Sequence, residues 1–551
     1  MNTVDLKLDF NERVDQLPEW LGEFQLQVKD LWQYPNRQAL EAKMAQDLTL
    51  DAGQLLLTNG GDESIELLYK LSKLDDMPLL IPEPCFSQYT HNQGVWQNEV
   101  TFVPAQADLS IDTAAVKGQI KSGQCVILTR PNNPTGEFLA DDVLRDLIEA
   151  AADKGAWVFL DEAYIEFAAQ SDINYYCEYD NVICLRTFSK AFGLAGVRVG
   201  YILGNEQLIG RIRRLTMPFN VSQANLQIAA QAWEQRNSVS DYCQQIRQNR
   251  TVVSDYLTAQ GLFVCPAQGN FLLFRVSEQQ KTLIANVLKK QGIQIKTALG
   301  GLPDCLRMTI PYQVESVMTA LKQIFEPVAV AFDMDGVLID TSLSYDLAIV
   351  DTVESFTGKV VTIDQIVSKR SQGGYNNDWV LAQAMIEDLG QVEDLQKVTD
   401  VFQTFYLGTE TQRGRFKDEV NLLRNDSPLF ASSKSDTSKM RAVVTGRPRF
   451  EAKQGVAQLG ITPAFVVSLD DVKNGKPDPE GILWLQKQWQ LSDSDGMYFC
   501  GDNVDDMQAG NAAQCICVGI SGGSEQQENV LYQAGADVVL ENINQLEALF
   551  S

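Results

Sequence analysis

The first half of the chain is organised around one stretch, Val182-Ile-Cys-Leu-Arg186-Thr-Phe-Ser-Lys190-Ala-Phe-Gly-Leu-Ala-Gly-Val-Arg198. It begins as a short apolar run, which is typical of a buried strand, and continues into hydroxyl and small residues around a lysine. Two similar apolar runs, at residues 125–129 and 156–160, precede it. Amphipathic segments lie between these runs, and this alternation indicates a mostly parallel sheet with crossover helices.

The bulk properties of the chain exclude several kinds of partner. Its 551 residues are too many for one core, and 45% hydrophobic with 21% charged residues is typical of globular domains. A formal charge of −27 argues against nucleic acid or an anionic membrane as a partner. We see neither a secretory signal nor an apolar stretch of ~18 residues that could span a membrane. These features lead us to expect a cytoplasmic enzyme with small-molecule substrates.

Cysteine and histidine usage restricts the chemistry further. The ten cysteines are scattered, as expected for small core side chains in a reducing compartment. The single histidine, His91, argues strongly against zinc hydrolysis and serine–histidine triads.

The first domain is expected to end near residue 326. Residues 239–260 predict a long helix, residues 271–276 and 306–310 predict strands of a smaller lobe, and residues 315–324 predict a closing helix. The tripeptide Phe325-Glu326-Pro327 then serves as a short linker. We therefore predict a first α/β domain over residues 1–326.

A second α/β domain is predicted over residues 327–551. It opens with Val328-Ala-Val-Ala-Phe-Asp333, and strand patterns return at residues 441–445 and 497–501. Residues from about 343 to 435 are helical and charged. A helical insertion within an α/β unit indicates a cap over a site.

Several polar residues of the first domain follow predicted strands or precede predicted helices. Lys190 alone is compatible with an ordinary surface lysine, and Asp161, at the end of an apolar run, with a helix N-cap. Asn133 lies in Arg130-Pro-Asn-Asn-Pro-Thr-Gly136, which could be a simple turn. Gly60-Gly-Asp62 precedes a helical run, so its free N–H groups could hold a phosphate. Together these groups favour a cleft at the carboxyl ends of the strands.

Residues 1–326 resemble fold-type I aminotransferases, specifically the histidinol-phosphate aminotransferase subfamily. The motifs that carry the resemblance occur in the family order: Tyr34-Pro35, Gly60-Gly-Asp-Glu63, Pro131-Asn-Asn-Pro-Thr-Gly136, Asp161-Glu-Ala-Tyr164, Thr187-Phe-Ser-Lys190-Ala and Leu306-Arg-Met-Thr309. The resemblance implies a seven-stranded, mostly parallel sheet with a small α/β lobe, pyridoxal 5′-phosphate as cofactor, and a homodimer.

The resemblance also implies roles for individual residues. Lys190 would form the Schiff base with pyridoxal phosphate and move a proton between Cα and C4′. Asp161 would pair with the ring nitrogen. The other implied cofactor contacts are Asn133 and Tyr164 to the ring hydroxyl, Phe86 stacked on the ring, Thr187, Ser189, Arg198 and the backbone of Gly61 and Asp62 at the phosphate, and Tyr34 at the phosphate of the neighbouring subunit.

Substrate contacts are implied at Arg307, Arg13 and Lys296. Arg307 would bind the acidic end of the amino donor or acceptor, because a planar fork suits carboxylate or phosphate. Arg13 stands where the family usually has a tyrosine, and Lys296 where it has a second arginine. Charge is retained, so we expect an anionic substrate, either histidinol phosphate or another phosphorylated or aromatic amino compound. Decarboxylation of a phosphorylated amino acid is a further alternative.

The second domain carries four short motifs in sequence. Asp333-Met-Asp335-Gly could be only a polar turn after a buried strand, but three further motifs accompany it: Thr445-Gly446, Gly475-Lys476-Pro-Asp-Pro479 and Gly501-Asp502-Asn-Val-Asp505-Asp506. Each is expected at the carboxyl end of a parallel strand, where α/β sheets bind ligands.

Residues 328–551 resemble haloacid dehalogenase-superfamily phosphatases with a helical cap and a Rossmann-like sheet. The resemblance implies that Asp333 is the nucleophile and that Asp335 protonates the leaving alcohol and then activates water. Thr445 and the Gly446 amide would hold phosphoryl oxygens, and Lys476 would neutralise charge. The implied Mg²⁺ site consists of Asp333, the Asp335 carbonyl and Asp502, with Asp506 as outer-shell acid and Asp505 as a possible substitute. Asn376, Asn377 and Trp379 of the cap are candidates for substrate contacts.

The two sets of motifs predict a bifunctional enzyme. Transamination between imidazole acetol phosphate and glutamate, followed by hydrolysis of histidinol phosphate to histidinol, would be two consecutive steps of histidine biosynthesis. The alternatives are the same chemistries on another phosphorylated amino compound, or one domain with only a regulatory or scaffolding role.

Overall fold

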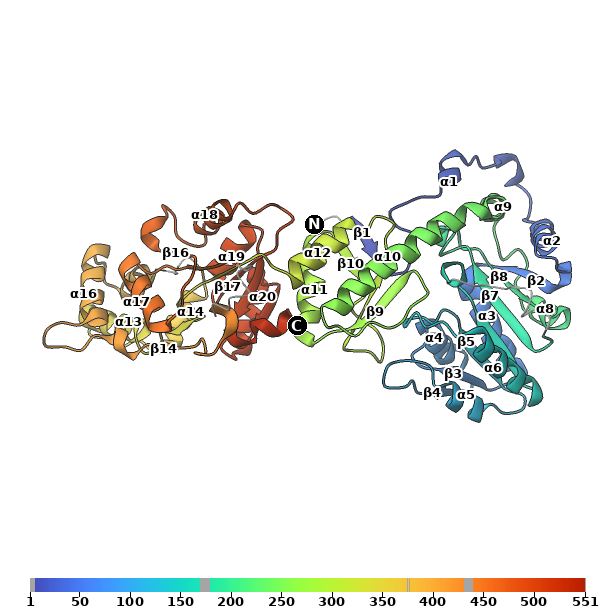
Figure 1. The fold of residues 1–551 in the computed structure, drawn as a ribbon, viewed down its shortest axis with the longest axis horizontal. Helices are drawn as coiled ribbons and strands as arrows, with labels where there is room; N and C mark the ends of the chain where they lie inside the picture. The colour runs from blue at the N-terminus through green and yellow to red at the C-terminus, as the bar shows by residue number, and fades with distance from the viewer. Residues whose placement is uncertain (1–4, 169–178, 374, 376, 431–439, 551) are drawn as a thin grey trace. The chain divides into compact units, whose positions relative to one another are not determined.

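The computed structural model describes residues 5–168, 179–373, 375, 377–430 and 440–550, drawn as a ribbon in Figure 1. The chain divides into two compact units, residues 1–276 with 292–315, and residues 277–291 with 316–551. The helices α11 (Glu278–Lys290) and α12 (Glu315–Phe325) thus group with the second unit, apart from the first residue of α12. The domain boundary at residue 327 stays a prediction. No helix in the described ranges is long and apolar enough to cross a membrane.

A seven-stranded sheet forms the centre of the first unit within the described chain. Its order is β2 (Leu55–Thr58), β8 (Gly200–Gly204), β7 (Val182–Thr187), β6 (Trp157–Asp161), β5 (Cys125–Thr129), β3 (Leu79–Pro82) and β4 (Val100–Val103). Only β8 runs antiparallel to its neighbours. Strands β2, β3, β5, β7 and β8 are buried along their whole length, which explains their unbroken apolar runs. The expected mostly parallel seven-stranded sheet is confirmed.

Helices accompany this sheet along the chain. They are α1 (Glu19–Glu23), α2 (Gln38–Asp47), α3 (Gly60–Leu74), α4 (Ser87–Trp96), α5 (Thr113–Gln119), α6 (Asp141–Asp153), α8 (Glu206–Arg213), α9 (Gln223–Glu234) and α10 (Val239–Ala259). The apolar side of α3, including Ile65 and Leu68, joins Leu56 and Phe159 of the sheet in one core. The long helix expected at residues 239–260 is α10.

Short strands build the smaller lobe of the first unit. β1 (Leu6–Leu8) pairs in parallel with β10 (Ile293–Ile295). β9 (Phe271–Arg275) pairs antiparallel with β11 (Cys305–Thr309). The strands predicted near residues 271 and 306 are therefore present, and their pairing brings the N-terminal segment next to residues 293–309.

The second unit contains a six-stranded parallel sheet within its described residues. Its order is β16 (Phe465–Val467), β15 (Met440–Val444), β12 (Ala329–Phe332), β17 (Met497–Gly501), β18 (Ile516–Ile520) and β19 (Val538–Leu540). Its helices after the cap are α17 (Arg449–Leu459), α18 (Glu480–Trp489), α19 (Val504–Ala512) and α20 (Glu525–Ala534). The Rossmann-like arrangement expected for this part of the chain is confirmed.

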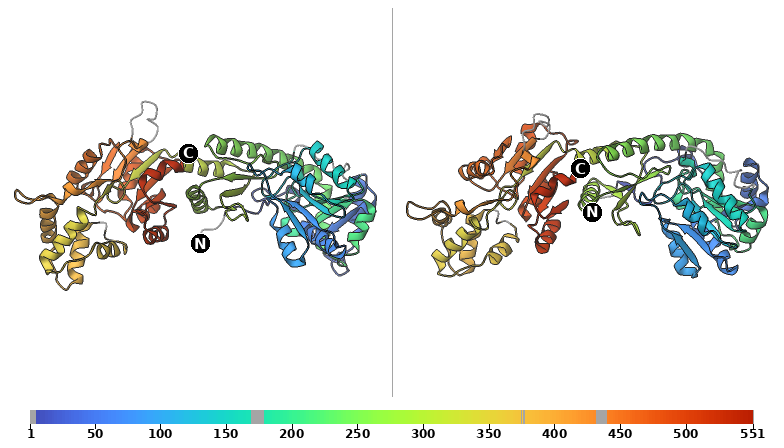
Figure 2. Two further views of the ribbon diagram at one scale, coloured as in Figure 1. Left: turned by 90° about the horizontal axis from the view of Figure 1, so that it is seen from below. Right: turned by 60° about the horizontal axis from the view of Figure 1, so that its bottom comes forward.

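Four helices form the cap of the second unit in its described part. They are α13 (Tyr345–Thr357), α14 (Ile363–Arg370), α15 (Asp378–Asp388) and α16 (Leu395–Leu407). They share a core of their own, and in Figure 2 they gather beside the orange and red sheet. A two-stranded hairpin, β13 (Ile339–Asp340) with β14 (Val420–Asn421), connects the two ends of the insertion. Helices occupy much of the described part of residues 343–435, and the cap with these bounds stays a prediction.

Candidate active sites

Three neighbouring strands place the predicted residues of the first site at one edge of the sheet. Asn133 follows β5, Asp161 ends β6, and Lys190 follows β7, and these strands lie side by side. The Lys190 Nζ donates a hydrogen bond to the Phe10 carbonyl oxygen at 2.9 Å and lies 5.4 Å from the centre of the Tyr164 ring. The N-terminal segment therefore forms part of this site.

Asp161 is a buried carboxylate with two hydrogen-bond donors. The Tyr89 hydroxyl donates to its Oδ2 at 2.7 Å, and the Ala163 amide donates to its Oδ1 at 3.0 Å. Burial raises the pKa of Asp161, and the hydrogen bond from Tyr89 opposes that shift. A cationic ring nitrogen would compensate for the buried negative charge. Tyr89 was missed in the sequence, because its position in α4 belongs to no recognised motif.

A network of amide and guanidinium groups surrounds the Tyr164 hydroxyl. Asn133 Nδ2 and Asn11 Nδ2 donate to this oxygen at 3.3 and 3.1 Å. Arg307 donates to Asn133 Oδ1 at 2.6 Å and to the Asp9 carbonyl oxygen at 2.7 Å. Its Nε is buried without a hydrogen-bond partner among the described groups. Sequence reasoning did not assign Asn11 a role, although it lies two residues before Arg13.

A pocket edge suited to a phosphate lies at the start of α3. Thr187 Oγ1 and Ser189 Oγ are 3.0 Å apart, and Arg198 donates to Ser189 Oγ at 3.5 Å and to Asp62 Oδ2 at 2.6 Å. A Cβ on Gly60 would lie 2.6 Å from Arg198 Nη2. Gly60 also has a φ of 75°, a backbone conformation that favours glycine at this position. Free N–H groups of a helix start, hydroxyls and a cation are the groups that hold phosphates.

The remaining predicted cofactor residues have different surroundings. Phe86 precedes α4, and its ring contacts Tyr89 edge-on at 6.3 Å. Tyr34 is 79% exposed and stacks on Phe219 with ring centres 4.4 Å apart. Phe219 is not one of the predicted cofactor residues. The cofactor roles of all these residues stay predictions.

The three cationic residues predicted for substrate binding gather near Lys190. Arg13 lies over the Tyr242 ring at 3.9 Å and donates to the Ala191 carbonyl oxygen at 3.4 Å. The backbone of Lys296 pairs with that of Arg307. The Lys296 Nζ lies 5.3 Å from the centre of the ring of Phe10, whose carbonyl accepts from Lys190. The contacts therefore connect all three cations to the environment of Lys190.

The second site brings the predicted acidic residues together around Lys476. The Lys476 ammonium lies 2.7 Å from Asp333 Oδ1 and 2.5 Å from Asp506 Oδ1. Among the described side chains, Asp333, Asp502 and Asp506 offer oxygens within 4.8 Å of one another. Burial, with Asp506 nearby, raises the pKa of Asp502 to about 7, and burial raises the pKa of Asp333 as well. One lysine does not compensate for this negative charge, so the cluster fits a bound divalent cation.

A small cavity of about 50 Å³ opens on these acids. Asp333, Asp335, Gly446 and Asp502 line it from the core domain. The cap lines it with Asn377 and Trp379, together with Arg370 and Asp378. Thr445 directly follows β15 and precedes Gly446, and Asn376 lies outside the described residues.

Arg447 is the main residue of the second site that the motifs did not predict. It follows Thr445-Gly446 directly, is 2% exposed, and its Nη2 lies 2.6 Å from Asp335 Oδ1. Glu419, from the returning limb of the cap, accepts from the same guanidinium at 3.0 Å. Arg447 could have been predicted as a site residue from its position next to the Thr445-Gly446 motif. No sequence motif indicates a role for Glu419.

Comparisons with known proteins agree with this geometry. The model of the aminotransferase class I and II family matches residues 6–324, and that of haloacid dehalogenase-like hydrolases matches residues 330–520. A histidinol-phosphate aminotransferase of Methylibium petroleiphilum is 32% identical over 58% of this chain and 89% of its own length. One of Pyrococcus furiosus is 30% identical over 58% and 92%.

Solved structures show the same fold for the first part of the chain. The histidinol-phosphate aminotransferase of Sinorhizobium meliloti in complex with pyridoxal-5′-phosphate is 22% identical, with a TM-score of 0.52 over 58% of this chain and 89% of its own. The putative histidinol-phosphate aminotransferase of Erwinia carotovora atroseptica is also 22% identical, with a TM-score of 0.53 over 58% and 94%.

Fold and sites together define a pyridoxal-phosphate-dependent aminotransferase joined to a phosphatase. The chain belongs to the aminotransferase class I and II family and carries a haloacid dehalogenase-like hydrolase domain after it. The predicted families and fold class are therefore confirmed.

Proposed function

We propose that this chain carries out two consecutive reactions of histidine biosynthesis. The first domain transaminates imidazole acetol phosphate with glutamate, giving histidinol phosphate and 2-oxoglutarate. The second domain hydrolyses histidinol phosphate to histidinol and phosphate with Mg²⁺. The observation that carries the proposal is the presence, in one chain, of the Lys190 site with histidinol-phosphate aminotransferase relatives and of the Asp333–Lys476 site.

The residues of the first site fit pyridoxal phosphate. When bound, the cofactor supplies an electron sink for the electrons of the substrate Cα–H bond. Lys190 would carry the proton abstracted from the substrate Cα, and Asp161 would keep the ring nitrogen protonated. Asn133 and Tyr164 would hold the ring oxygen. Thr187, Ser189, Arg198, Gly61 and Asp62 would hold the phosphate.

Cations near Lys190 support an anionic substrate. The guanidinium of Arg307 has a buried Nε without a partner in the described chain, so an incoming carboxylate or phosphate oxygen would satisfy it. Arg13 and Lys296 add two positive charges in the same neighbourhood. A substrate with both a carboxylate or phosphate and an amino group suits these charges.

The second site suits hydrolysis of a phosphate ester in two steps. Asp333 attacks phosphorus, the bond from phosphorus to the alcohol oxygen breaks, and Asp335 gives its proton to that oxygen. Asp335 then takes a proton from water, which releases phosphate from Asp333. Thr445, the Gly446 amide and Lys476 stabilise the negative charge on the transferred group. Asp333, the Asp335 carbonyl and Asp502 would hold Mg²⁺, with Asp506 in the outer shell.

Joining the two reactions has a thermodynamic advantage. Transamination exchanges similar bonds and runs close to equilibrium, whereas hydrolysis of a phosphate ester is effectively irreversible. The second reaction would therefore draw the first one toward product.

The direct test supplies the purified chain with imidazole acetol phosphate, glutamate and Mg²⁺. We expect histidinol and inorganic phosphate to accumulate together, and to stop accumulating when glutamate is omitted. Absence of turnover at either stage would contradict the histidine assignment but leave both reaction classes open.

Arg13 favours a second candidate substrate class. Because it stands near Lys190 in place of the usual tyrosine, the first domain could act on another phosphorylated or aromatic amino compound, including decarboxylation of a phosphorylated amino acid. These substrates can be distinguished by adding candidate amino donors one at a time and measuring which of them shifts the absorbance of the cofactor. Retention of the Cα carboxylate in the product excludes decarboxylation.

An exposed apolar surface supports a homodimer of the aminotransferase domain. Its members lie in residues 17–34 and beside α9, and they are Leu17, Val28, Leu31, Trp32, Tyr34, Met217 and Phe219. Exposed apolar side chains gathered in this way are typical of an interface. In such a dimer Tyr34 would reach the cofactor phosphate of the partner. Sedimentation analysis should show a dimer. Tyr34→Phe should weaken cofactor binding, while the protein should remain dimeric.

A further inference from the structure

Arg447 is held by four side-chain hydrogen bonds and a short ion pair inside the second unit. A guanidinium carries five N–H groups. Its Nε and Nη2 reach Asp335 Oδ1 at 2.8 and 2.6 Å, and Nη1 and Nη2 donate to the two Glu419 oxygens at 3.2 and 3.0 Å. Nη1 also donates to the Tyr406 hydroxyl at 3.4 Å. These contacts engage all three nitrogens of the guanidinium, which lines the cavity that would receive a phosphate ester.

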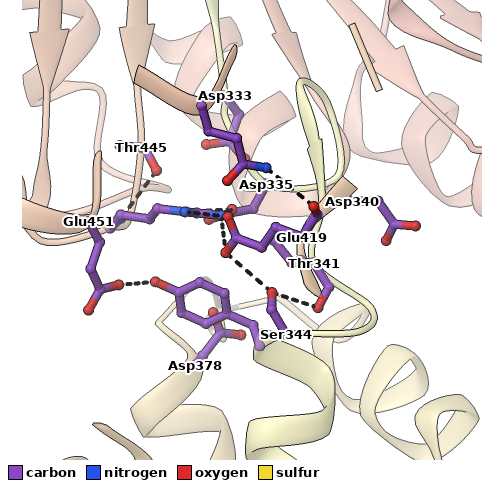
Figure 3. A network of polar contacts seen from close by, with 12 residues as sticks. Asp333, Asp335, Asp340, Thr341, Ser344, Asp378, Glu419, Thr445 and Glu451 are labelled. Carbon is purple, nitrogen blue, oxygen red and sulfur yellow. Dashed lines mark hydrogen bonds and ion pairs between the residues drawn. The ribbon is translucent and has the colours of Figure 1, made fainter. Parts of the chain in front are cut away.

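Glu419 sets the orientation of this guanidinium from the cap. It is buried, and its Oε1 also accepts from the Tyr406 hydroxyl at 2.8 Å and from Ser344 Oγ at 3.3 Å. Figure 3 shows Glu419 beside Asp335, with Ser344 on its other side. Because a carboxylate and a guanidinium are both planar, two parallel hydrogen bonds fix their mutual orientation. The remaining edge of Arg447 is then directed at Asp335.

A second pair of contacts holds the same part of the cap against the core. Glu451, on α17, accepts hydrogen bonds from Tyr345 of α13 and, at 2.9 Å, from Gln403 of α16. The Tyr345 ring lies 5.0 Å from the Arg447 guanidinium. Cap helices therefore contact both Arg447 and Glu451, which lie four positions apart. The position of Arg447 thus depends on the position of the cap.

We propose that Arg447 is the positioning residue for Asp335, and that Glu419 makes this positioning depend on the cap. Arg447 holds the Asp335 carboxyl group where the leaving alcohol departs, and it does so only while the cap supplies Glu419. The inference rests on the proposed role of Asp335 as proton donor and acceptor. It assigns Arg447 no contact with the substrate.

The test compares two phosphate esters that differ in their need for a proton donor. An alkyl ester, histidinol phosphate, needs protonation of its leaving oxygen, whereas 4-nitrophenyl phosphate releases a stable phenolate without it. In Arg447→Met we expect kcat for the alkyl ester to fall about 100-fold, the low end of general-acid contributions. KM should change less than about threefold, and nitrophenolate release in the first turnover should stay within about threefold of the parent rate.

Two further variants complete the experiment. Glu419→Gln keeps the shape of the side chain but removes its charge, and should show the same leaving-group dependence with a loss of about tenfold. Arg449→Met removes an exposed arginine that pairs with Asp471, and should leave both rates unchanged. If Arg447→Met does not fold, as judged by its circular dichroism melting curve, Glu419→Gln decides the question alone.

The outcomes separate the inference from the function on which it rests. If the parent protein with Mg²⁺ hydrolyses neither ester, the proposed phosphatase function fails. If the parent is active but the folded variants lose the rate of first-turnover alcohol release equally for both esters, or for neither, the positioning role of Arg447 is wrong. A rise in KM with unchanged kcat would also overturn it, because Arg447 would then bind substrate.

Discussion

Lys190 and Asp333 are the single residues on which, in the proposed function, the two activities separately depend. Lys190→Ala should abolish covalent cofactor attachment and transamination while sparing phosphatase activity. Asp333→Asn should do the reverse, because an amide is a poor nucleophile toward phosphorus. Cofactor absorbance and phosphate release measured on both variants test this expectation. Loss of both activities from either change would indicate one composite site.

Glu166 is a residue whose charge should make stability depend on pH. Its Oε2 is buried without a hydrogen-bond partner in the described chain, and burial raises its pKa from 4.5 to about 7 in spite of nearby Arg186. The folded protein therefore holds a proton that the unfolded chain releases, and stability falls as pH rises from about 4.5 to 7. Glu166→Gln removes this cost.

The variant should therefore unfold at a higher temperature than the parent at pH 8, and the difference should shrink toward pH 5. We expect about 1–3 kcal/mol at pH 8, because one pKa unit corresponds to about 1.4 kcal/mol. Glu234→Gln, at the exposed end of α9, is the control and should show no such divergence. A difference that stays constant with pH would contradict this account.

At the scale of elements, the start of α3 must lie directly against β8. A Cβ on Gly200 would lie 2.8 Å from the Gly60 carbonyl carbon and 3.0 Å from the Gly61 nitrogen. Gly200→Ala should therefore displace the helix start that we propose holds the phosphate, and weaken pyridoxal phosphate binding about tenfold or more. Phosphatase activity should be unaffected. Gly210→Ala, in α8, meets no atom within 4 Å and serves as the control.

Fluorescence titration of the apoprotein with pyridoxal phosphate measures this effect. Equal affinities of Gly200→Ala and Gly210→Ala would show that the contact between β8 and α3 does not support the cofactor site.

Elements also explain which site residues could be predicted from sequence. Asp161, Lys190, Asp333 and Asp502 follow apolar strands, and the carboxyl ends of parallel strands meet at one edge of a sheet. Local patterns therefore sufficed to predict where they lie in the fold. Tyr89 lies on a helix 72 positions from its partner Asp161, so only the folded arrangement reveals its role.

At the scale of the whole molecule, α11 contributes to the stability of the second unit. The Lys290 ammonium lies 2.8 Å from Asp537, which is fully buried, and also donates to Asn511 Oδ1 at 2.6 Å. Lys290→Met leaves a buried carboxylate without its cation, and should destabilise this unit by about 2–4 kcal/mol. Adding Asp537→Asn should recover much of that loss.

Thermal unfolding followed through phosphatase activity measures the stability of this unit. Lys289→Met, at the adjacent exposed position, is the matched control. If the double variant is no more stable than Lys290→Met, the pair does not account for the effect, and Lys290 acts through other contacts.

The sequence by itself determined the two chemistries, their order along the chain and the residues at the ends of strands. It could do so because each reactive group lies in a short motif attached to an apolar run. Only the tertiary structure decided which distant groups complete the sites, such as Asn11 at Tyr164, 153 positions away, and Glu419 at Arg447. The physical reason is that hydrogen bonds and ion pairs require close distances between side chains, and only chain packing sets these distances.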